Sequence, residues 1–204
     1  MLALALALPA GDPTAAAAPA EAASAEAASA ETIPVAIDEK LVKYLIEGDT
    51  ASELQSQMKK LGPIDQHEGK RFAGSTNWDL RWNYLMAPQP DGRCRLQQVA
   101  ITLQVTMTLP EWQPKHRADQ LLKSHWPAFL AALTNHEMGH RANGVRAAFA
   151  VRDALAAVAP AESCQQLGDT ANAVAKAAME SRQGADVEYD RQTEHGVRQG
   201  VRLL

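Results

Sequence analysis

Residues 121–158 read LLKSHWPAFLAALTNHEMGHRANGVRAAFAVRDALAAV and carry the period of an α-helix. Apolar side chains recur there at spacings of three and four and form one stripe: Leu122, Trp126, Phe129, Leu130, Leu133, Ala147, Ala148, Val151, Leu155 and Val158. We therefore predict one long helix, from about residue 117 to residue 158, with this stripe turned toward the core.

The predicted helix contains the motif His-Glu-Met-Gly-His at residues 136–140. Positions four apart lie on one helix face, so His136 and His140 can hold a single zinc ion with Glu137 beside it. A catalytic zinc takes three protein ligands and leaves a place for water, which a neighbouring carboxylate deprotonates. We predict His136 and His140 as zinc ligands and Glu137 as the catalytic base. Gly139 predicts that another backbone or a substrate approaches the helix closely.

The third zinc ligand has to come from another part of the chain. His116 and His125 lie at or near the start of the same helix, too far along its axis to reach the same metal. His67 lies in a polar loop. His195, which follows the last predicted helix just before Gly196, is therefore the preferred third ligand, since a neutral imidazole suits zinc.

Other polar residues near His195 offer competing or supporting roles. The carboxylates that compete as third ligand are those of Glu188, Asp190 and Glu194. Asp190 or Glu194 could instead accept the free ring hydrogen of a ligand histidine. Tyr189 is predicted to donate a hydrogen bond to the oxyanion that develops during catalysis.

The remaining pattern predicts a small sheet and two more helices. Strands are predicted at residues 41–46, 76–84 and 96–109, the last two forming an antiparallel hairpin and the last one ending at Pro110. A capping box starts a helix at Thr50, and a final helix is predicted from about residue 169 to residue 194. This order predicts an α+β, zincin-like fold with a small antiparallel-containing sheet, a long metal-motif helix and a second C-terminal helix.

Composition predicts one domain preceded by a leader. Residues 1–31 combine an apolar, signal-like start with an Ala-, Pro- and Glu-rich spacer predicted to be disordered, and residues 32–204 form the predicted domain. That domain contains 20 acidic and 20 basic residues, so we expect no nucleic-acid partner. No apolar run approaches the roughly 20 residues that span a bilayer, and we expect no integral membrane span.

Two cysteines, Cys94 and Cys164, are present. An even count in a chain with a signal-like start predicts one disulfide, whereas a cytosolic protein would keep two buried thiols. We expect the protein to be periplasmic or secreted.

Taken together, these pieces resemble the bacterial family known as domain of unknown function 922, described as predicted secreted zinc-dependent proteases. The matching pieces are Thr76-Asn77-Trp78, Leu109 to Trp112, the Trp126 to His140 helix, the two cysteines, and Tyr189-Asp190 with Thr193, His195 and Gly196. They cover roughly residues 35 to 197. The resemblance implies a periplasmic or secreted, zincin-like hydrolase.

The leading hypothesis is a zinc-dependent peptidase that hydrolyses amide bonds of a peptide or protein substrate, with Zn²⁺ as cofactor. The alternative is a non-catalytic envelope binding or adaptor protein whose zinc site is structural or vestigial. A metal-free helical interaction module is a third hypothesis.

Overall fold

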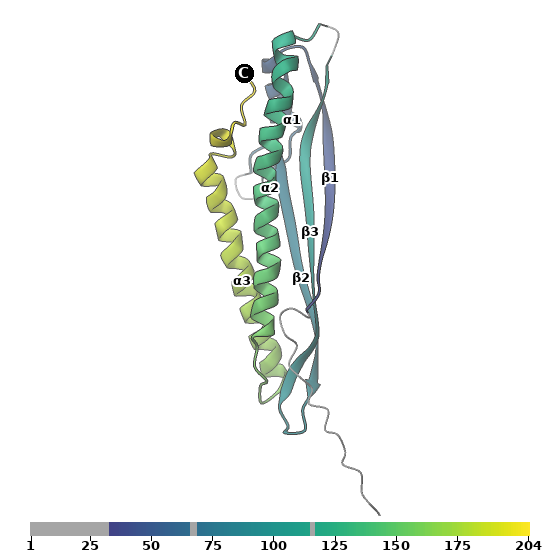
Figure 1. The fold of residues 1–204 in the computed structure, drawn as a ribbon, viewed down its shortest axis with the longest axis vertical. Helices are drawn as coiled ribbons and strands as arrows, with labels where there is room; N and C mark the ends of the chain where they lie inside the picture. The colour runs from purple at the N-terminus through teal and green to yellow at the C-terminus, as the bar shows by residue number, and fades with distance from the viewer. Residues whose placement is uncertain (1–32, 66–68, 115–116) are drawn as a thin grey trace, which may run out of the picture.

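The computed structural model of the chain describes residues 33–65, 69–114 and 117–204. These residues form an α+β fold with a three-stranded mixed sheet, three helices and a short 3₁₀ turn, as shown in Figure 1. The predicted leader and spacer at residues 1–31, like His67 and His116, lie outside the described residues.

The sheet has the strand order β1-β3-β2. Its strands are β1 (Val35–Gly48), β2 (Ser75–Pro88) and β3 (Cys94–Pro114). β3 runs parallel to β1 and antiparallel to β2, so the predicted hairpin is confirmed.

The sequence predicted that this strand ends at Pro110, but β3 continues to Pro114. β2 pairs with β3 only as far as Thr108, whereas β1 accompanies β3 to Pro114. Pro110 therefore lies where β3 has one open edge, and a proline without an N–H is tolerated at such an edge.

Helix α1 (Ala51–Leu61) begins as the sequence predicted. The Thr50 side chain accepts a hydrogen bond from the backbone N–H of Glu53, whose side chain accepts in return from the backbone of Thr50. The buried side chains of Leu54 and Met58 pack in a core cluster that also contains residues of the sheet.

Two long helices complete the fold, α2 (Gln120–Ala156) and α3 (Cys164–Thr193). α3 starts earlier than the predicted residue 169, because the Ser163 hydroxyl accepts from the backbone N–H of Gln166 and caps the helix there. Gly168 lies within the first turns of α3 and does not interrupt it.

Helices α2 and α3 lie side by side along the long axis of the molecule and cover one face of the sheet, as seen in Figure 1. The apolar stripe of α2 enters two separate core clusters. Leu122, Phe129 and Leu133 belong to the one, and Ala147, Ala148, Val151 and Leu155 belong to the other. The His-Glu-Met-Gly-His motif lies on α2 between these two clusters, so packed apolar side chains hold the helix on both sides of it.

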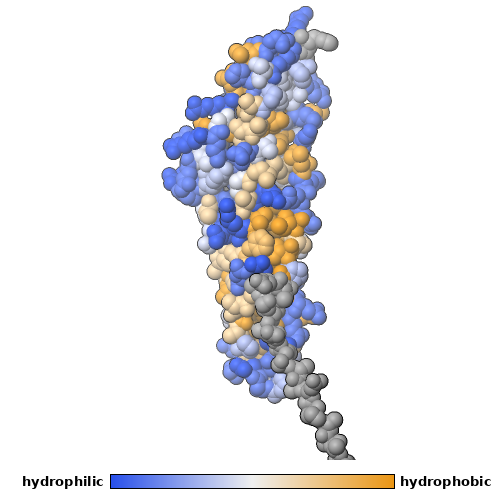
Figure 2. All heavy atoms as spheres, viewed as in Figure 1, coloured by the Kyte–Doolittle hydropathy of each residue, from blue (hydrophilic) through white to orange (hydrophobic). Residues whose placement is uncertain are grey.

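The side of the molecule in Figure 2 carries apolar residues along its middle and hydrophilic residues along both margins. α2 contributes the exposed side chains of Leu121, Met138 and Phe149 to the apolar surface of the protein. Among the described residues, no helix combines the length and the apolar character that crossing a bilayer requires.

Cys94 and Cys164 form a disulfide, which confirms the predicted pairing. The bond ties the first residue of β3 to the first residue of α3, and backbone hydrogen bonds of 2.8 and 2.9 Å between Cys94 and Ala161 lie beside it. The disulfide therefore anchors the start of α3 to the sheet.

We predict that replacing both cysteines by serine lowers the free energy of unfolding by about 4 kcal/mol, since the bridge closes a long loop in the unfolded chain. The sequence separation of the bridged cysteines is 70 residues. Urea unfolding of the double variant should match that of the reduced wild-type protein. Equal stability of oxidised wild type and double variant would contradict the prediction.

Candidate metal centre

The motif on α2 is buried. His136, Glu137 and His140 expose 3%, 2% and 7% of their surface, and in the part of the chain that the structure describes they are the only buried residues with polar or charged side chains. Burying such groups costs several kcal/mol unless they are paired or bind a metal. The contacts of these three residues therefore indicate whether they are stabilised by pairing with one another or by binding a metal ion.

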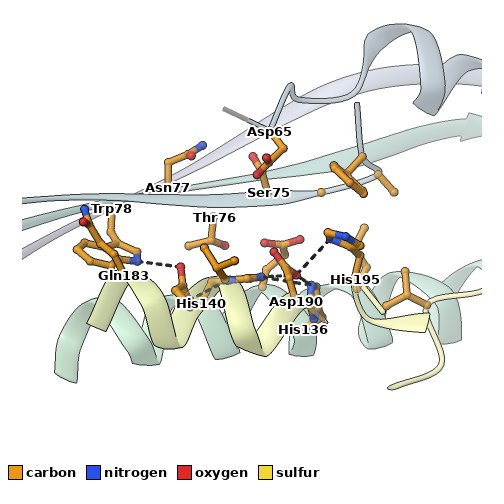
Figure 3. Close-up of a pocket in the computed structure, with 18 residues that line it drawn as sticks. Asp65, Ser75, Thr76, Asn77, Trp78, His136, His140, Gln183, Asp190 and His195 are labelled. Atoms are coloured by element: carbon orange, nitrogen blue, oxygen red, sulfur yellow. Dashed lines mark hydrogen bonds and ion pairs between the residues drawn. The ribbon is translucent and has the colours of Figure 1, made fainter. Parts of the chain in front are cut away.

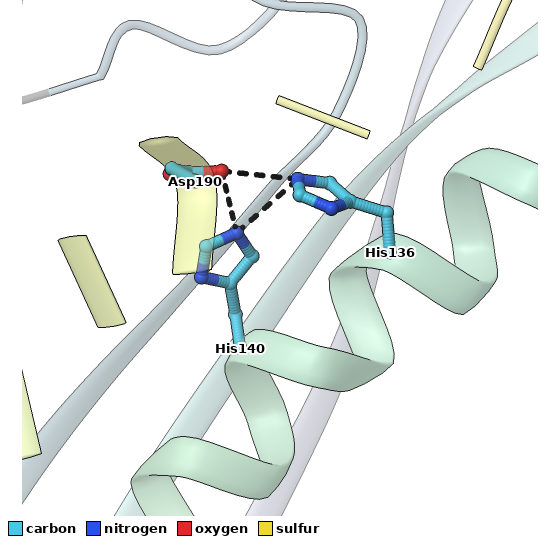
Figure 4. A group of neighbouring side chains, drawn as sticks. All are labelled: His136, His140 and Asp190. Atoms are coloured by element: carbon cyan, nitrogen blue, oxygen red, sulfur yellow. Dashed lines mark hydrogen bonds and ion pairs between the residues drawn. The ribbon is translucent and has the colours of Figure 1, made fainter. Parts of the chain in front are cut away.

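His136, His140 and Asp190 bring three ligand atoms together, as Figure 4 shows. Nε2 of His136 and Nε2 of His140 lie 3.3 Å apart, and Oδ1 of Asp190 lies 3.1 Å from each of them. Around a tetrahedral zinc with bonds of about 2.0–2.1 Å, neighbouring ligand atoms are about 3.3 Å apart. The triangle thus has the dimensions of one face of a zinc coordination tetrahedron, and its donor set fits that metal.

The other nitrogen of each histidine is held by a side chain behind the cluster. His136 Nδ1 lies 2.9 Å from Gln199 Oε1, and His140 Nδ1 lies 3.0 Å from Asp186 Oδ1. With Nδ1–H donating to these oxygens, both Nε2 atoms present their lone pairs to the cluster. Asp186 and Gln199 were not predicted from the sequence, although Asp186 precedes Asp190 by four residues and both carboxylates therefore lie on one face of α3.

Asp186 is itself fixed by two further donors. Trp78 Nε1 donates to its Oδ2 at 3.2 Å, and Asn143 Nδ2 donates to its Oδ1 at 2.7 Å. These bonds join β2, α2 and α3 at one carboxylate, so the orientation of the His140 ring depends on all three elements.

Charge in the cluster shifts two pKa values. Burial alone lowers the pKa of His140, but hydrogen bonds to Asp186 and Asp190 and their negative charges outweigh it and raise the pKa to about 10. Burial raises the pKa of Asp190, yet the hydrogen bonds of His136 and His140 hold it well below its usual range. A divalent cation entering the cluster would displace a proton from His140.

Glu137 lies on the wall of the same cavity as the three ligand atoms. Burial raises the pKa of its carboxyl group, and the charges of the two histidines and the side chain of Thr76 oppose this only in part. Its Oε2 atom is buried and has no hydrogen-bond partner among the described residues. A carboxylate oxygen that lacks a hydrogen-bond partner beside a candidate metal site is suited to accept a proton from a bound molecule.

Tyr189 lies behind the cluster and is not among the residues that line the cavity. Its ring stacks on that of His136 at 5.2 Å, and its hydroxyl donates to the backbone oxygen of His136 at 3.2 Å and accepts from Gln199 Nε2 at 3.0 Å. A Cβ at Gly139 would lie 2.2 Å from the Tyr189 hydroxyl. The side chain of Tyr189, and not the predicted backbone or substrate, is therefore what approaches Gly139 closely, and it supports the cluster from the side away from the cavity.

His195 lines the cavity but does not belong to the group of three ligand atoms. Its Nδ1 lies 3.4 Å from Asp190 Oδ1. Of the competing carboxylates, the structure brings Asp190 to the two motif histidines, whereas the side chains of Glu188 and Glu194 are 43% and 53% exposed and each pairs with an arginine. The structure thus brings Asp190, and not the preferred His195, together with the two motif histidines.

The cavity, of about 300 Å³, is shown in Figure 3. Residues 75–78 of β2 form one side of it, and α2 and α3 supply His136, His140 and Asp190 on the other. Among the described strands, β2 pairs with β3 alone and so has a second edge without a strand partner. The candidate centre therefore lies next to an edge strand of the sheet.

These features define an α+β protein with a candidate two-histidine, one-aspartate metal centre on its longest helix. The chain belongs to the family described as bacterial protein of unknown function (DUF922), which it matches over residues 41–196. No curated protein and no solved structure shows a significant match to it. The matched range contains the three candidate ligand residues, Glu137, Asp186 and His195.

We predict that Gly139→Ala lowers the free energy of unfolding by about 1–3 kcal/mol, because the new methyl group collides with Tyr189. Gly184→Ala is the matched control, since a Cβ at Gly184 of α3 meets nothing within 4 Å. This control should be more stable than wild type by about 0.5–1 kcal/mol, the usual advantage of alanine in a helix. Urea unfolding of both variants measures the difference, and stabilisation by Gly139→Ala would contradict the predicted collision.

We predict that Asp186→Asn weakens binding of Zn²⁺ by about 10- to 100-fold, since Nδ1 of His140 loses its negatively charged partner. Asp169→Asn, at an exposed position near the start of the same helix, is the control and should bind Zn²⁺ as wild type does. Competition titration with a chromogenic chelator measures both affinities. Equal affinities would show that Asp186 does not support the metal.

Proposed function

We propose that this protein is a zinc-dependent peptidase with a zincin-like centre, in which His136, His140 and Asp190 hold the zinc. The observation that supports this most directly is the triangle of ligand atoms with sides of 3.1, 3.1 and 3.3 Å. It is supported further by Asp186 and Gln199, which hold the Nδ1 atoms of both histidines in the manner common to zinc ligands.

Glu137 is the proposed general base. A zinc ion held by these ligands would polarise the scissile carbonyl and lower the pKa of the attacking water. Glu137 takes the proton of that water and passes it to the leaving nitrogen, which contributes about 10² to 10⁴ in rate. The raised pKa of its buried carboxyl group suits this exchange, because the proton must be both accepted and released.

The proposed substrate is a peptide or protein in extended conformation. Support comes from the edge strand β2, whose residues 75–78 line the cavity opposite the ligand residues. An extended peptide can add to such an edge through main-chain hydrogen bonds, which places one of its amide bonds beside the cluster.

Tyr189 has a supporting role in this proposal. Its contacts with His136, Gln199 and Gly139 keep the ring of His136 in place. Its hydroxyl is engaged in these contacts on the far side of the cluster from the cavity, so it is not assigned the oxyanion contact that the sequence had favoured.

The adaptor alternative would need a closed zinc site with four protein ligands. Within the described residues the cluster has three, and its remaining side faces the cavity. This arrangement favours a site open to water and substrate. The disulfide supports the further proposal of a periplasmic or secreted location, since such bonds persist in oxidising compartments.

The test combines metal analysis with Glu137→Gln. We expect purified protein to bind one zinc ion and to cleave members of a peptide library, and the Glu137→Gln variant to keep its zinc while kcat falls by about 10² to 10⁴. Glu180→Gln, an exposed change on α3, is the control and should cleave as wild type does. Mass spectrometry of the products measures cleavage. A Glu137→Gln variant as fast as wild type would refute the assigned base.

A further inference from the structure

The segment that leads into β2 runs directly against the carboxyl group of Glu137. A Cβ at Gly74 would lie 2.8 Å from Oε1 of Glu137 and 3.0 Å from Cδ1 of Leu133. Gly74 and Glu137 are both buried, and both line the cavity. A side chain at residue 74 would therefore have to displace Oε1 from its position beside the candidate metal site.

The backbone at Gly74 is held on both sides along the chain. The hydroxyl of Tyr44 in β1 donates a hydrogen bond of 2.7 Å to the carbonyl oxygen of Ala73. Tyr44 and Ala73 also pack against the same core cluster. From Ser75 onward the chain is paired with β3. The backbone of Gly74 thus lies between a fixed carbonyl group and a β-ladder, and it presents a firm wall to the carboxyl group.

Thr76, the second residue of β2, approaches the same carboxyl group. Figure 3 shows Thr76 between β2 and the helices, at the cavity that it lines together with Glu137. Burial raises the pKa of the Glu137 carboxyl group, and the side chain of Thr76 acts against this shift, so its hydroxyl lies near that group. Oγ1 of Thr76 is buried, and no hydrogen bond holds it elsewhere in the described chain. The hydroxyl is thus placed to donate to the carboxylate.

The two oxygens of the Glu137 carboxyl group have different surroundings. Oε1 lies against the backbone of Gly74, whereas Oε2 is buried without a hydrogen-bond partner among the described residues. A general base has to stay within hydrogen-bond reach of the water that it deprotonates, and a misplacement of about 1 Å can cost about 10²-fold in rate. A carboxylate that is fixed around one oxygen keeps the other oriented for that proton.

We propose that Gly74 and Thr76 are positioning residues for the proposed base Glu137: the backbone at Gly74 limits where Oε1 can lie, and the Thr76 hydroxyl donates a hydrogen bond to the carboxylate. The inference rests on the proposed peptidase function and adds how the base is held. Residues 75–78 also form the edge at which the substrate is proposed to bind, so one strand serves both the substrate and the base. Changes to these two side chains should act on kcat and leave zinc affinity and KM unaltered.

The first experiment is Gly74→Ala. The backbone of Gly74 has no positive φ, so alanine suits its conformation. We expect the new methyl group to displace Oε1 and kcat to fall by about 10²-fold, with zinc affinity and KM unchanged. Gly184→Ala, whose Cβ meets nothing within 4 Å, is the matched control and should cleave peptides as wild type does.

The second experiment is Thr76→Val, which removes the hydroxyl and keeps the branched shape of the side chain. We expect kcat to fall by about 10-fold, because a hydrogen bond to a charged group is lost, and Thr76→Ser to restore most of the rate. Thr102→Val, the same change in β3 at a residue that does not line the cavity, is the control. This pair carries the test if circular dichroism shows that Gly74→Ala is unfolded.

A double-mutant cycle tests the contact without measuring catalysis. Gly74→Ala should lower the equilibrium constant for folding by about 10-fold in the wild-type protein. The loss should be clearly smaller in Glu137→Ala, which lacks the oxygen that the methyl group meets. Urea unfolding of the four proteins measures both losses, and equal losses would show that Gly74 does not constrain the carboxyl group.

The remaining outcomes separate this inference from the proposed function. Unchanged kcat in both Gly74→Ala and Thr76→Val, with kcat still lost in Glu137→Gln, would overturn the positioning role and leave the peptidase proposal standing. Loss of zinc from folded Gly74→Ala would show that the segment supports the metal ligands and not the base. A zinc-loaded wild-type protein that cleaves no peptide would refute the peptidase proposal and this inference together.

Discussion

The contact on which this molecule depends is the meeting of two buried imidazoles and one partly exposed carboxylate, at separations near 3 Å, in the wall of a cavity. Burying such groups is unfavourable unless each finds a partner. The protein satisfies them with the Nδ1 contacts of Gln199 and Asp186 and with the charge of Asp190. A divalent cation would stabilise the cluster further, because the two Nε2 atoms and the carboxylate oxygen that face one another can all donate electron pairs to it.

The elements around this cluster are arranged to bring distant parts of the chain to it. α2 supplies His136 and His140, α3 supplies Asp186 and Asp190, and the turn after α3 returns Gln199 to His136. The disulfide holds the start of α3 to the sheet. Near the end of α3, Trp78 of β2 donates a hydrogen bond to Asp186. The geometry of the proposed site therefore depends on how closely α3 packs against α2, which Gly139 permits by leaving room for Tyr189.

This arrangement redistributes the roles of the polar residues near the end of α3. Asp190 takes the position proposed for the third ligand, Tyr189 supports His136 from behind, and His195 faces the cavity where a substrate would bind. The proposed centre thus combines three metal-binding side chains, a base in Glu137 and the ring of His195 around one cavity. Its open side and the adjacent edge strand favour chemistry on an extended chain over a purely structural metal.

Local sequence signals were enough to predict the helices, the hairpin, the capping box at Thr50 and the closeness of His136 and His140, because periodicity, capping and motif spacing are short-range properties. The disulfide, which bridges 70 residues, was predicted from the even cysteine count and the signal-like start. The end of β3 was predicted wrongly because a proline is tolerated where a strand has an open edge. Pairing with β2 ends at Thr108, so Pro110 lies at such an edge while β1 still pairs with β3. The position of Asp190 at the cluster, and of His195 beside it, depended on the rotation of α3 against α2 and on the left-handed turn at residues 194–196. Those features arise from packing between residues about 50 positions apart, so only the folded chain could decide between an imidazole and a carboxylate as the third proposed ligand.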